Sequence, residues 1–400
     1  MSKLALLGGS PVRTTPFLPH TVMGKEELKQ IKEVLKSGVL SGFIAKAGPK
    51  FHGGVKVQSL EKSFRDYFAV PFAIAVNSAT SGLHAAIAAL GIGPGDEVIV
   101  PPYTMSASAT AILMHNAIPV FCDITEDTFC IDPQKLESVI TERTKAIIVV
   151  HLFGHPADMD AITVIAQKHG LKIIEDCAQA PAALYKNKLV GTLGDIAVFS
   201  FNQNKIITSG EGGVIVTPHE QYAHTAELVR NHGEVVVHDM GVHNIVNTLG
   251  WNYRMTELEA AVALAQFKKL DDLTAIRIRL ADYVTQKLSK MPGIITPQRK
   301  PWAKHVYFTY PIRILEETLG ISRQTFIKAL AAEGIPLAGG YVRPIYFEPV
   351  YAQKLAYGTK GCPFTCSFYG KERNYPHGLC PVTERLYAQQ LATLGVCRFP

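Results

Sequence analysis

The chain has 400 residues and a formal net charge of +6, with its basic residues scattered along the sequence. This pattern excludes the clustered basic stripe of a nucleic-acid-binding protein and favours small anionic ligands. Hydrophobic residues make up 47% and charged residues 18% of the chain, a composition that excludes a disordered protein. The length exceeds that of one ordinary core, so we expect two domains.

The N-terminus, Met1 to Pro11, lacks the basic segment and long apolar run of a signal peptide, and no apolar stretch reaches spanning length. We therefore expect a cytoplasmic protein without a membrane partner. The seven cysteines lie in a long, enzyme-like chain that needs no disulfide framework, so we expect reduced thiols.

Four residues near the C-terminus could supply zinc ligands. They are Cys362, Cys366, His377 and Cys380. Their spacing matches no common zinc finger. We favour a Gly/Pro-rich loop with free thiols and no metal.

From Phe72 to Val216, apolar runs alternate with helical stretches, a pattern typical of an α/β doubly wound, mainly parallel sheet. The seven predicted strands are Phe72–Val76, Glu97–Val100, Pro119–Cys122, Ala146–His151, Leu171–Glu175, Ile196–Phe201 and Gly213–Val216. Helical periodicity without proline predicts helices over Ser81–Leu90 and Met159–His169. Ligands of such sheets bind beyond the carboxyl ends of the strands.

Beyond the sheet, an apolar stripe predicts one long helix from Met255 to Lys290 that connects two domains. We expect a strand over Tyr307–Ile314 and a helix over Arg323–Gly334. The segment Gly339–Cys380 is rich in Gly, Pro, Tyr and Cys. Loops of that length usually bind a ligand or line an interface.

Asp176 and Gln179 follow a buried strand in the stretch LKIIEDCAQA. A carboxylate there could keep a pyridine nitrogen protonated, as pyridoxal 5′-phosphate (PLP) requires when it acts as an electron sink. Gln179 could reach the phenolic oxygen of the same ring. An Asp after a strand is equally consistent with a helix N-cap or a metal ligand.

Lys205 lies in a loop between an apolar strand and the glycine-rich turn GEGG. A lysine in a loop is usually a solvated surface charge. The flanking strand and glycines favour a buried amine, whose pKa desolvation would lower, leaving it free to attack an aldehyde and to carry protons.

The stretch Phe72–Leu90 reads as strand, tight turn and helix, so the amides near Ala79 and Thr80 would face outward at a helix N-terminus. Such a terminus binds phosphate, and Thr80 and Ser200 could add hydroxyl donors. Joints of this kind also occur as plain helix caps. The three elements together indicate a single cofactor site.

These residues together resemble the DegT/DnrJ/EryC1/StrS family of PLP-dependent sugar aminotransferases over almost the whole chain. The matching stretches are NSATSGLHAA, GDEVIVPPYT, HLFGHPADMD, EDCAQA, FSFNQNK, GEGG, NYRMTELEAA and CPVTER. Each is unspecific alone, but their order and spacing make the combined match specific.

The resemblance implies the type I, aspartate aminotransferase-like fold, with a large domain around a seven-stranded mainly parallel sheet and a smaller α+β C-terminal domain. The implied divisions are residues 1–50 as an N-terminal arm and helix on the small domain, 51–254 as the PLP-binding domain, 255–290 as the connecting helix, and 291–400 as the small domain with a substrate-side loop.

The resemblance also implies the roles of the site residues. Lys205 would hold PLP as a Schiff base, Asp176 would pair with the ring nitrogen and Gln179 with the ring hydroxyl. Ala79, Thr80 and Ser200 would hold the phosphate. Asn252 resembles a residue that the neighbouring subunit contributes to the same phosphate, which implies a homodimer with shared active sites.

Three positions refine this interpretation. Met105 stands where many relatives carry an aromatic residue that stacks on the cofactor ring, and a thioether can pack there more softly. Tyr103 could substitute for the missing ring or belong to the core. Some relatives have His in place of the lysine and eliminate a hydroxyl, so Lys205 favours transamination.

Five further residues lie in segments that resemble the family's substrate-contacting regions, and each could instead be a surface or interface residue. They are Arg254, His232, Tyr341, Arg343 and Tyr346. The leading hypothesis is a glutamate- or glutamine-dependent aminotransferase for a nucleotide-linked 3-keto or 4-keto hexose. The rival substrate is an inosose, suggested by the opening LALLGGSPVR. A PLP-binding regulator without turnover is the alternative from another class.

Overall fold

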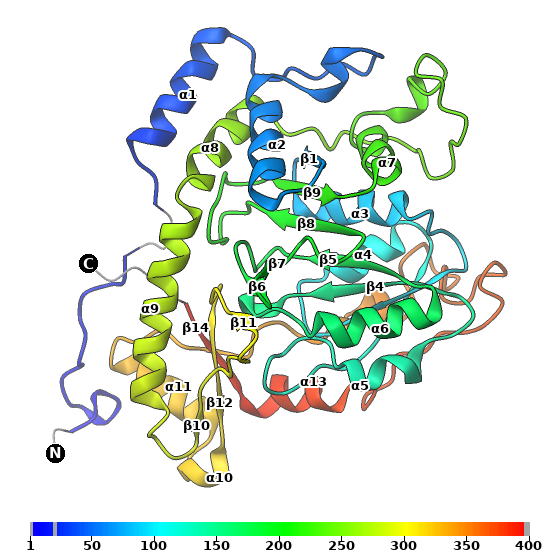
Figure 1. Ribbon diagram of the computed structural model, residues 1–400. Coiled ribbons are helices and arrows are strands. Elements are labelled where there is room, and N and C mark those ends of the chain that lie inside the picture. The colour runs from blue at the N-terminus through cyan, green and yellow to red at the C-terminus, as the bar shows by residue number, and fades with distance from the viewer. Residues whose placement is uncertain (1–2, 19–21, 396–400) are drawn as a thin grey trace.

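The structure is a computed structural model that describes residues 3–18 and 22–395. Its largest element is a seven-stranded sheet (Figure 1). In spatial order the strands are β1 (Phe72–Val76), β9 (Gly213–Thr217), β8 (Ile196–Ser200), β5 (Lys172–Asp176), β4 (Thr144–Val150), β2 (Glu97–Val100) and β3 (Ile118–Phe121). Only β9 runs against its neighbours. The predicted sheet is confirmed, with every strand end within two residues of its expected position.

Alternating side chains divide the core into two apolar layers, because successive residues of a strand face opposite sides of the sheet. Ile74 and Val76 of β1 belong to one layer, and Ala73 and Ala75 belong to the other. The first layer includes helices α3 (Ala79–Ala89), α4 (Ala107–Leu113), α6 (Met159–His169) and α7 (Glu220–Arg230). The second includes α2 (Val55–Phe68) and α8 (Glu257–Phe267).

A second, antiparallel sheet is formed by the C-terminal part of the chain. Its strands, in order, are β10 (Ile294–Ile295), β12 (Tyr310–Ile314), β14 (Leu391–Leu394) and β13 (Ala338–Gly339). It has its own apolar cluster, to which α9 (Leu270–Leu288) and α11 (Arg323–Ala332) contribute. A small third sheet joins β11 (Ala303–Lys304), β6 (Leu184–Tyr185) and β7 (Lys188–Leu189). The remaining short helices are α5 (Pro133–Leu136), α10 (Glu316–Leu319), α12 (Pro349–Ala352) and α13 (Pro381–Arg385).

The single long helix predicted from Met255 to Lys290 is wrong in one respect, because it is interrupted between α8 and α9 at Lys268 and Lys269. Lys269 Nζ lies 2.6 Å from Glu27 Oε1 in α1 (Lys25–Ser37), and Gln266 donates to the same oxygen. Lysine is a good helix former, so the sequence pattern does not reveal this interruption.

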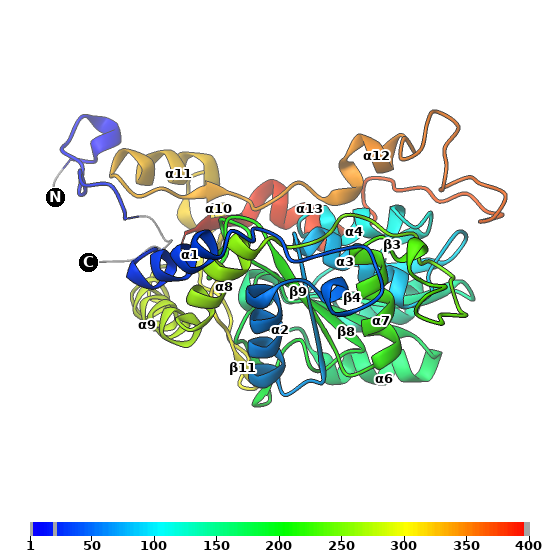
Figure 2. The same ribbon diagram turned by 90° about the horizontal axis from the view of Figure 1, so that it is seen from above.

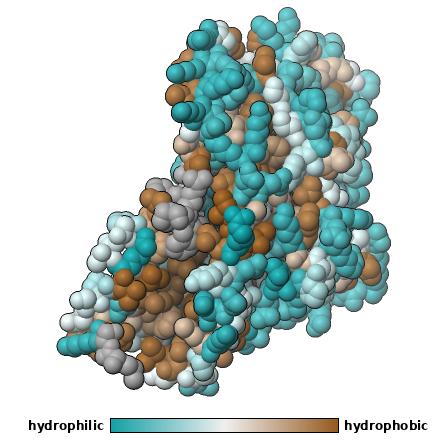
Figure 3. All heavy atoms as spheres, turned by 60° about the vertical axis from the view of Figure 1, so that its left-hand side comes forward, coloured by the Kyte–Doolittle hydropathy of each residue, from teal (hydrophilic) through white to brown (hydrophobic). Residues whose placement is uncertain are grey.

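The N-terminal segment and α1 contact different parts of the chain. The segment is held at the end of α11, where the Glu333 carboxylate accepts from the amides of Ala5 and Val12. Between this segment and α9 lies an apolar groove, visible as brown side chains in the hollow at the lower left of Figure 3. In contrast, α1 lies on α8. The domain divisions stay a prediction, and their residues 1–2, 19–21 and 396–400 lie outside the described residues.

Residues 341–385, here called the strap, cover the free edge of β3, which ends the large sheet (Figure 2). Tyr375 donates to the carbonyl of Pro119 in β3 at 2.7 Å. Tyr369 donates to Glu97, the first residue of β2, at 2.6 Å. The middle of the strap therefore lies at the amino-terminal edge of the parallel strands, whereas Ile345 contacts Pro102 at the carboxyl edge.

Among the described helices, none is long and apolar enough to cross a membrane.

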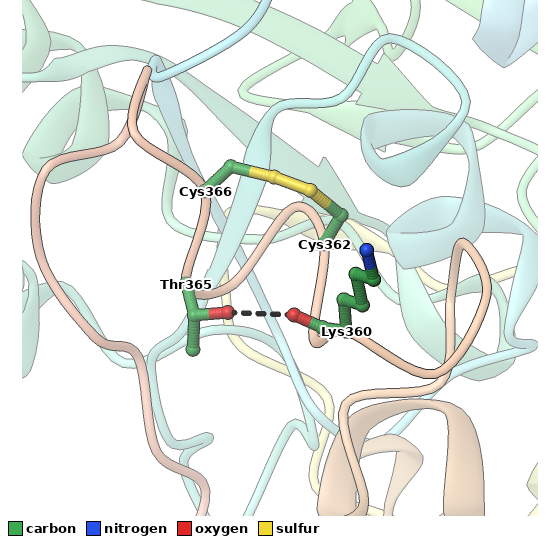
Figure 4. Close-up of a disulfide and its surroundings, with 4 residues drawn as sticks. All are labelled: Lys360, Cys362, Thr365 and Cys366. Carbon is green, nitrogen blue, oxygen red and sulfur yellow. Dashed lines mark hydrogen bonds between the residues drawn. A yellow bond between two sulfur atoms is a disulfide. The ribbon is translucent and has the colours of Figure 1, made fainter.

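The expectation of reduced thiols is wrong for two cysteines of the strap. Cys362 and Cys366 form a disulfide, beside the hydrogen bond from Thr365 to the Lys360 carbonyl (Figure 4). Their sulfur atoms are therefore not available as thiolate ligands for zinc. Cys380 is a buried free thiol.

Candidate active site

Lys205 lies in the loop after β8, at the carboxyl edge of the sheet where ligands were expected. Its amide donates to the carbonyl of Asn202, and its Nζ lies 4.7 Å from the centre of the Phe308 ring. Burial lowers the pKa of the Lys205 amine, and the nearby charge of Asp176 opposes that shift. A larger fraction of this amine is therefore neutral and nucleophilic than of an ordinary lysine.

Asp176 is the last residue of β5 and is 5% exposed. Ser108 in α4 donates to its Oδ2 at 2.8 Å, and the amide of Ala178 donates to its Oδ1 at 3.1 Å. Both oxygens are thus held in place, and Asp176 is near enough to influence Lys205. This arrangement suits a carboxylate that pairs with a protonated ring nitrogen.

Gln179 is buried in the loop after Asp176 and is fixed at both ends of its amide. Its Oε1 accepts from the amide of Phe153 at 2.9 Å. Its Nε2 donates to the Tyr341 hydroxyl at 2.9 Å. Because the backbone N–H of Phe153 can only donate, the Gln179 atom that faces it must be the oxygen, and this fixes which end of the amide is the carbonyl.

The turn between β1 and α3 leaves the first amides of α3 without helical partners, as at any helix N-terminus. Ser78 caps the helix by accepting from the amide of Ser81 at 3.1 Å. Gly213 opens β9 beside this turn, and a Cβ on it would lie only 2.8 Å from the nitrogen of Ala79. Thr80 is exposed at this terminus, so backbone and hydroxyl donors are available to a phosphate.

Ser200 and Met105 also lie at strand ends on this edge. The Ser200 hydroxyl accepts from the amide of Asn202 at 3.3 Å. Met105 is 56% exposed, so its thioether is free to pack on a ligand. Tyr103 does not replace the missing aromatic ring, because it is fully buried and its hydroxyl accepts from the amide of Tyr341.

Asn252, Arg254 and His232 lie together on a segment beside the α3 turn. Asn252 pairs with Asn231 and accepts from the Asn77 side chain at 3.3 Å through its carbonyl. Its side chain is exposed. Arg254 donates to the Asn231 side chain at 3.0 Å, and His232 is half-exposed.

Of the three tyrosine and arginine candidates in the strap, the structure brings only Tyr341 to the site. Arg343 is exposed, with its guanidinium 5.7 Å from the centre of the Phe347 ring. Tyr346 is fully buried, and its hydroxyl bonds the Glu384 carboxylate and the Cys380 amide. The interpretation of Tyr346 as a substrate contact is therefore wrong, because its side chain belongs to the core.

Sequence reasoning missed three residues that hold the site together: Ser108, Phe153 and Phe308. Ser108 lies in a helix of small residues, where the sequence alone suggests only a packing role. Phe153 has a φ of 56°, a backbone conformation that its sequence does not predict. Phe308 reaches Lys205 because its amide donates to the carbonyl of Phe153 at 2.8 Å, a contact between distant segments.

One other group of potential ligand atoms exists among the described residues, formed by His151, Glu175 and Cys177. Its histidine and carboxylate atoms already have partners. His151 Nδ1 accepts from the Ala157 amide and its Nε2 donates to Glu175, which also accepts three backbone amides. We interpret this group as a structural link between β4 and β5.

The described residues fit PLP: a nucleophilic amine, a held carboxylate, an amide donor and a helix N-terminus opened by Gly213 all lie at one edge of the sheet. Fold and site define a PLP-dependent transferase of the aspartate aminotransferase-like type. The chain belongs to the DegT/DnrJ/EryC1/StrS aminotransferase family, whose sequence profile matches residues 22–386. It is a PLP-dependent aminotransferase.

Three related proteins illustrate the range of the family. The chain is 43% identical to GDP-perosamine synthase of Caulobacter vibrioides over 297 residues, which cover 74% of this chain and 78% of that protein. It is 36% identical to L-glutamine:2-deoxy-scyllo-inosose aminotransferase of Streptomyces lividus over 370 residues, or 89% and 86% of the two chains. The crystal structure of DesV from S. venezuelae superposes with a TM-score of 0.80 at 32% identity, covering 96% of this chain and 94% of that one.

Proposed function

We propose that this aminotransferase moves an amino group from glutamate or glutamine to a nucleotide-linked 3-keto or 4-keto hexose, by a ping-pong mechanism through Lys205. The observation that carries the aminotransfer step is the partly buried Lys205 amine near Asp176, with its pKa lowered by desolvation. The similarity to GDP-perosamine synthase supports a nucleotide-linked sugar as the acceptor.

Each site residue has a separate role in this proposal. Bound PLP supplies an electron sink that stabilises negative charge at the substrate carbon. Lys205 Nζ carries the proton to and from that carbon, Asp176 keeps the ring nitrogen protonated, and Gln179 donates to the ring oxygen. Ala79, Thr80 and Ser200 hold the phosphate, and Met105 packs on the ring face.

Substrate contacts remain proposals for Arg254, His232 and Arg343, whereas the Tyr341 hydroxyl accepts from Gln179. The first two lie on the segment of Asn252, whose side chain we propose to enter the site of a neighbouring subunit in a homodimer. Guanidinium groups would suit the carboxylate of the amino donor or the phosphates of a nucleotide sugar.

An inosose is the second candidate acceptor, supported by the similarity to an inosose aminotransferase. The two acceptors differ in chemistry, because an inosose has no nucleotide. A pocket that needs diphosphate contacts would discriminate strongly against an inosose.

The test uses the purified, PLP-loaded chain and two readouts. Glutamate or glutamine alone should convert the yellow cofactor to its pyridoxamine spectrum, and Lys205→Ala should abolish this change. A panel of nucleotide-linked 3-keto and 4-keto hexoses and inososes then identifies the acceptor by product formation. Turnover of inososes alone would contradict the nucleotide-sugar proposal, and a spectrum unchanged by any donor would indicate a PLP-binding regulator.

A further inference from the structure

The amide of Gln179 connects the large sheet to the start of the strap by hydrogen bonds, accepting from the backbone of Phe153 and donating to the Tyr341 side chain. We propose that Tyr341 is a positioning residue that holds this amide with its NH₂ group toward the ring oxygen of the cofactor. The proposal rests on the proposed function of the site and assigns to Tyr341 a role through Gln179 instead of a direct substrate contact.

The direction of the Gln179 amide follows from its two partners. Phe153 N–H must donate, so Oε1 faces the backbone after β4. Nε2 then has two hydrogens, one of which goes to the Tyr341 hydroxyl at 2.9 Å. The second hydrogen remains to donate to a ligand oxygen at the carboxyl edge of the sheet.

Phe153 is itself held firmly enough to direct Gln179. Its φ of 56° lies in the left-handed region, which is costly for a bulky residue. Its carbonyl accepts from the amide of Phe308 at 2.8 Å, and the next residue, Gly154, packs closely against Val306 and Gln179. The backbone donor to Gln179 is therefore fixed by contacts on both sides.

Tyr341 is fixed in the same way on the opposite side of the amide. Its N–H donates to the Tyr103 hydroxyl at 3.0 Å, and its ring meets the Phe153 ring edge to face, with centroids 5.1 Å apart. Burial, with the charge of Asp176, raises the pKa of Tyr341 to about 12. The hydroxyl thus stays neutral at physiological pH and keeps accepting from Nε2.

Tyr341 directly follows β13 and the turn at Gly340, so it belongs to the segment that leaves the second sheet. Without its hydroxyl, Nε2 loses the acceptor that opposes rotation of the amide. The donor to the ring oxygen would then be present for only part of the time, and the charged form of that oxygen would be less stable.

The test compares Tyr341→Phe with the wild type, both loaded with PLP. The substitution keeps the ring and removes the hydroxyl. We expect the pH midpoint of the bound cofactor's absorbance change to rise by about 0.5 to 1 unit, and the dissociation constant for PLP to rise about 3- to 10-fold. Tyr103→Phe, which removes the hydroxyl that holds the Tyr341 backbone, should shift both quantities in the same direction by less.

Tyr346→Phe is the matched control, because it removes a buried tyrosine hydroxyl from the same strap whose partners are Glu384 and Cys380, not Gln179. It should lower the melting temperature without moving the midpoint. A double variant with Gln179→Leu should show no further shift from Gln179→Leu alone, since Tyr341 acts only through that amide.

Two results would overturn the proposal. One is an unchanged midpoint and PLP affinity in a folded Tyr341→Phe protein, and the other is a shift that adds fully to that of Gln179→Leu. A higher KM for the ketone with an unchanged midpoint would show a direct substrate contact instead. Failure of the proposed function would look different, because the wild type would then bind PLP but aminate no ketone.

Discussion

Lys205 differs from the surface lysines of the chain in its surroundings, with the Phe308 ring on one side and the Asp176 carboxylate nearby. Burial lowers the pKa of this amine. Because only the neutral amine attacks an aldehyde, a lowered pKa allows the reaction at lower pH. We predict that PLP binds covalently to the cofactor-free protein with a rate that levels off at a lower pH than the range in which exposed lysines titrate.

The rise of cofactor absorbance over a series of pH values measures this rate. A second measurement labels all amines with a general reagent and follows each lysine by peptide mass spectrometry. It compares the labelling rate of Lys205 with that of Lys62, which is exposed in a pair with Asp66. A rate that keeps rising to the pH range of exposed lysines would contradict the prediction.

At the scale of single residues, a strand end is enough to predict where Lys205 and Asp176 lie, and their roles toward the cofactor stay predictions. The sequence could not separate Tyr341 from Tyr346, which lie five positions apart in the same segment. The first reaches Gln179 and the second packs against Phe121 with its hydroxyl on Glu384. These partners are distant in sequence, so burial of either tyrosine is decided by packing that no local pattern encodes.

Helices α2 and α7 are joined through a buried ion pair at β1. Arg230 Nη1 donates to Glu61 at 2.7 Å and to the Ala75 carbonyl at 3.2 Å. Burial raises the pKa of Glu61, and the Arg230 charge opposes that shift. Removing one partner would leave a buried charge without compensation, so we predict that Arg230→Met lowers the free energy of unfolding by about 3 to 5 kcal/mol.

The pH dependence of this loss has a definite sign. Without Arg230 the pKa of Glu61 rises further above its unfolded value, so stability is retained at low pH and lost as the pH rises through that range. Denaturant unfolding at pH 5 and pH 8 should show the larger loss at pH 8. Equal losses at both values would contradict a charge effect, and Glu61→Leu combined with Arg230→Met should recover part of the stability.

The disulfide of the strap closes a short loop, with only four positions separating Cys362 from Cys366. Chain entropy for a loop of this size gives a stabilisation of about 2 kcal/mol. The strap keeps its contacts to Glu97 and Pro119 without it. We predict that replacing both cysteines by serine lowers the melting temperature by a few degrees and leaves PLP affinity unchanged, because Glu97 begins its strand at the edge opposite Lys205.

Differential scanning fluorimetry with and without a dithiol reductant measures this effect. The reductant should lower the melting temperature of the wild type and leave that of the double variant unchanged. A loss of PLP affinity on reduction would show that the strap and the cofactor site are coupled through this loop.

Among the elements, apolar runs and their alternation were sufficient to predict all seven strands of the large sheet. The interruption between α8 and α9 was not predicted. Lys269, at this interruption, donates to Glu27, which lies 242 positions away, and no local pattern reveals such a contact. The strap was seen only as a long loop, since its path along β3 depends on tyrosine hydroxyls that reach backbone carbonyls elsewhere. The local sequence pattern therefore predicts the strands of the sheet, whereas contacts between distant residues determine how the loops cover it.

Over the whole molecule, exposed apolar side chains gather on the segment that carries Asn252. They are Val235, Ile245, Val246, Leu249 and Trp251. Apolar residues gathered in this way on a surface commonly mark a contact with another protein. This observation supports the proposed homodimer, in which the segment would reach the site of the other subunit.

The position of Asn252 allows two arrangements that mixed dimers can distinguish. In its own chain Asn252 lies beside Asn77, just before α3, whereas the proposed dimer brings its side chain to the partner's phosphate site. In a mixed dimer of Lys205→Ala and Asn252→Ala chains, a shared arrangement leaves one site with both residues intact. Random mixing makes half of the dimers mixed, so about a quarter of the wild-type number of sites should be active.

If Asn252 serves its own chain, every site carries a defect and mixing the two inactive proteins should restore no activity. Donor-dependent conversion of the cofactor spectrum after co-refolding measures the outcome, and each variant refolded alone is the control.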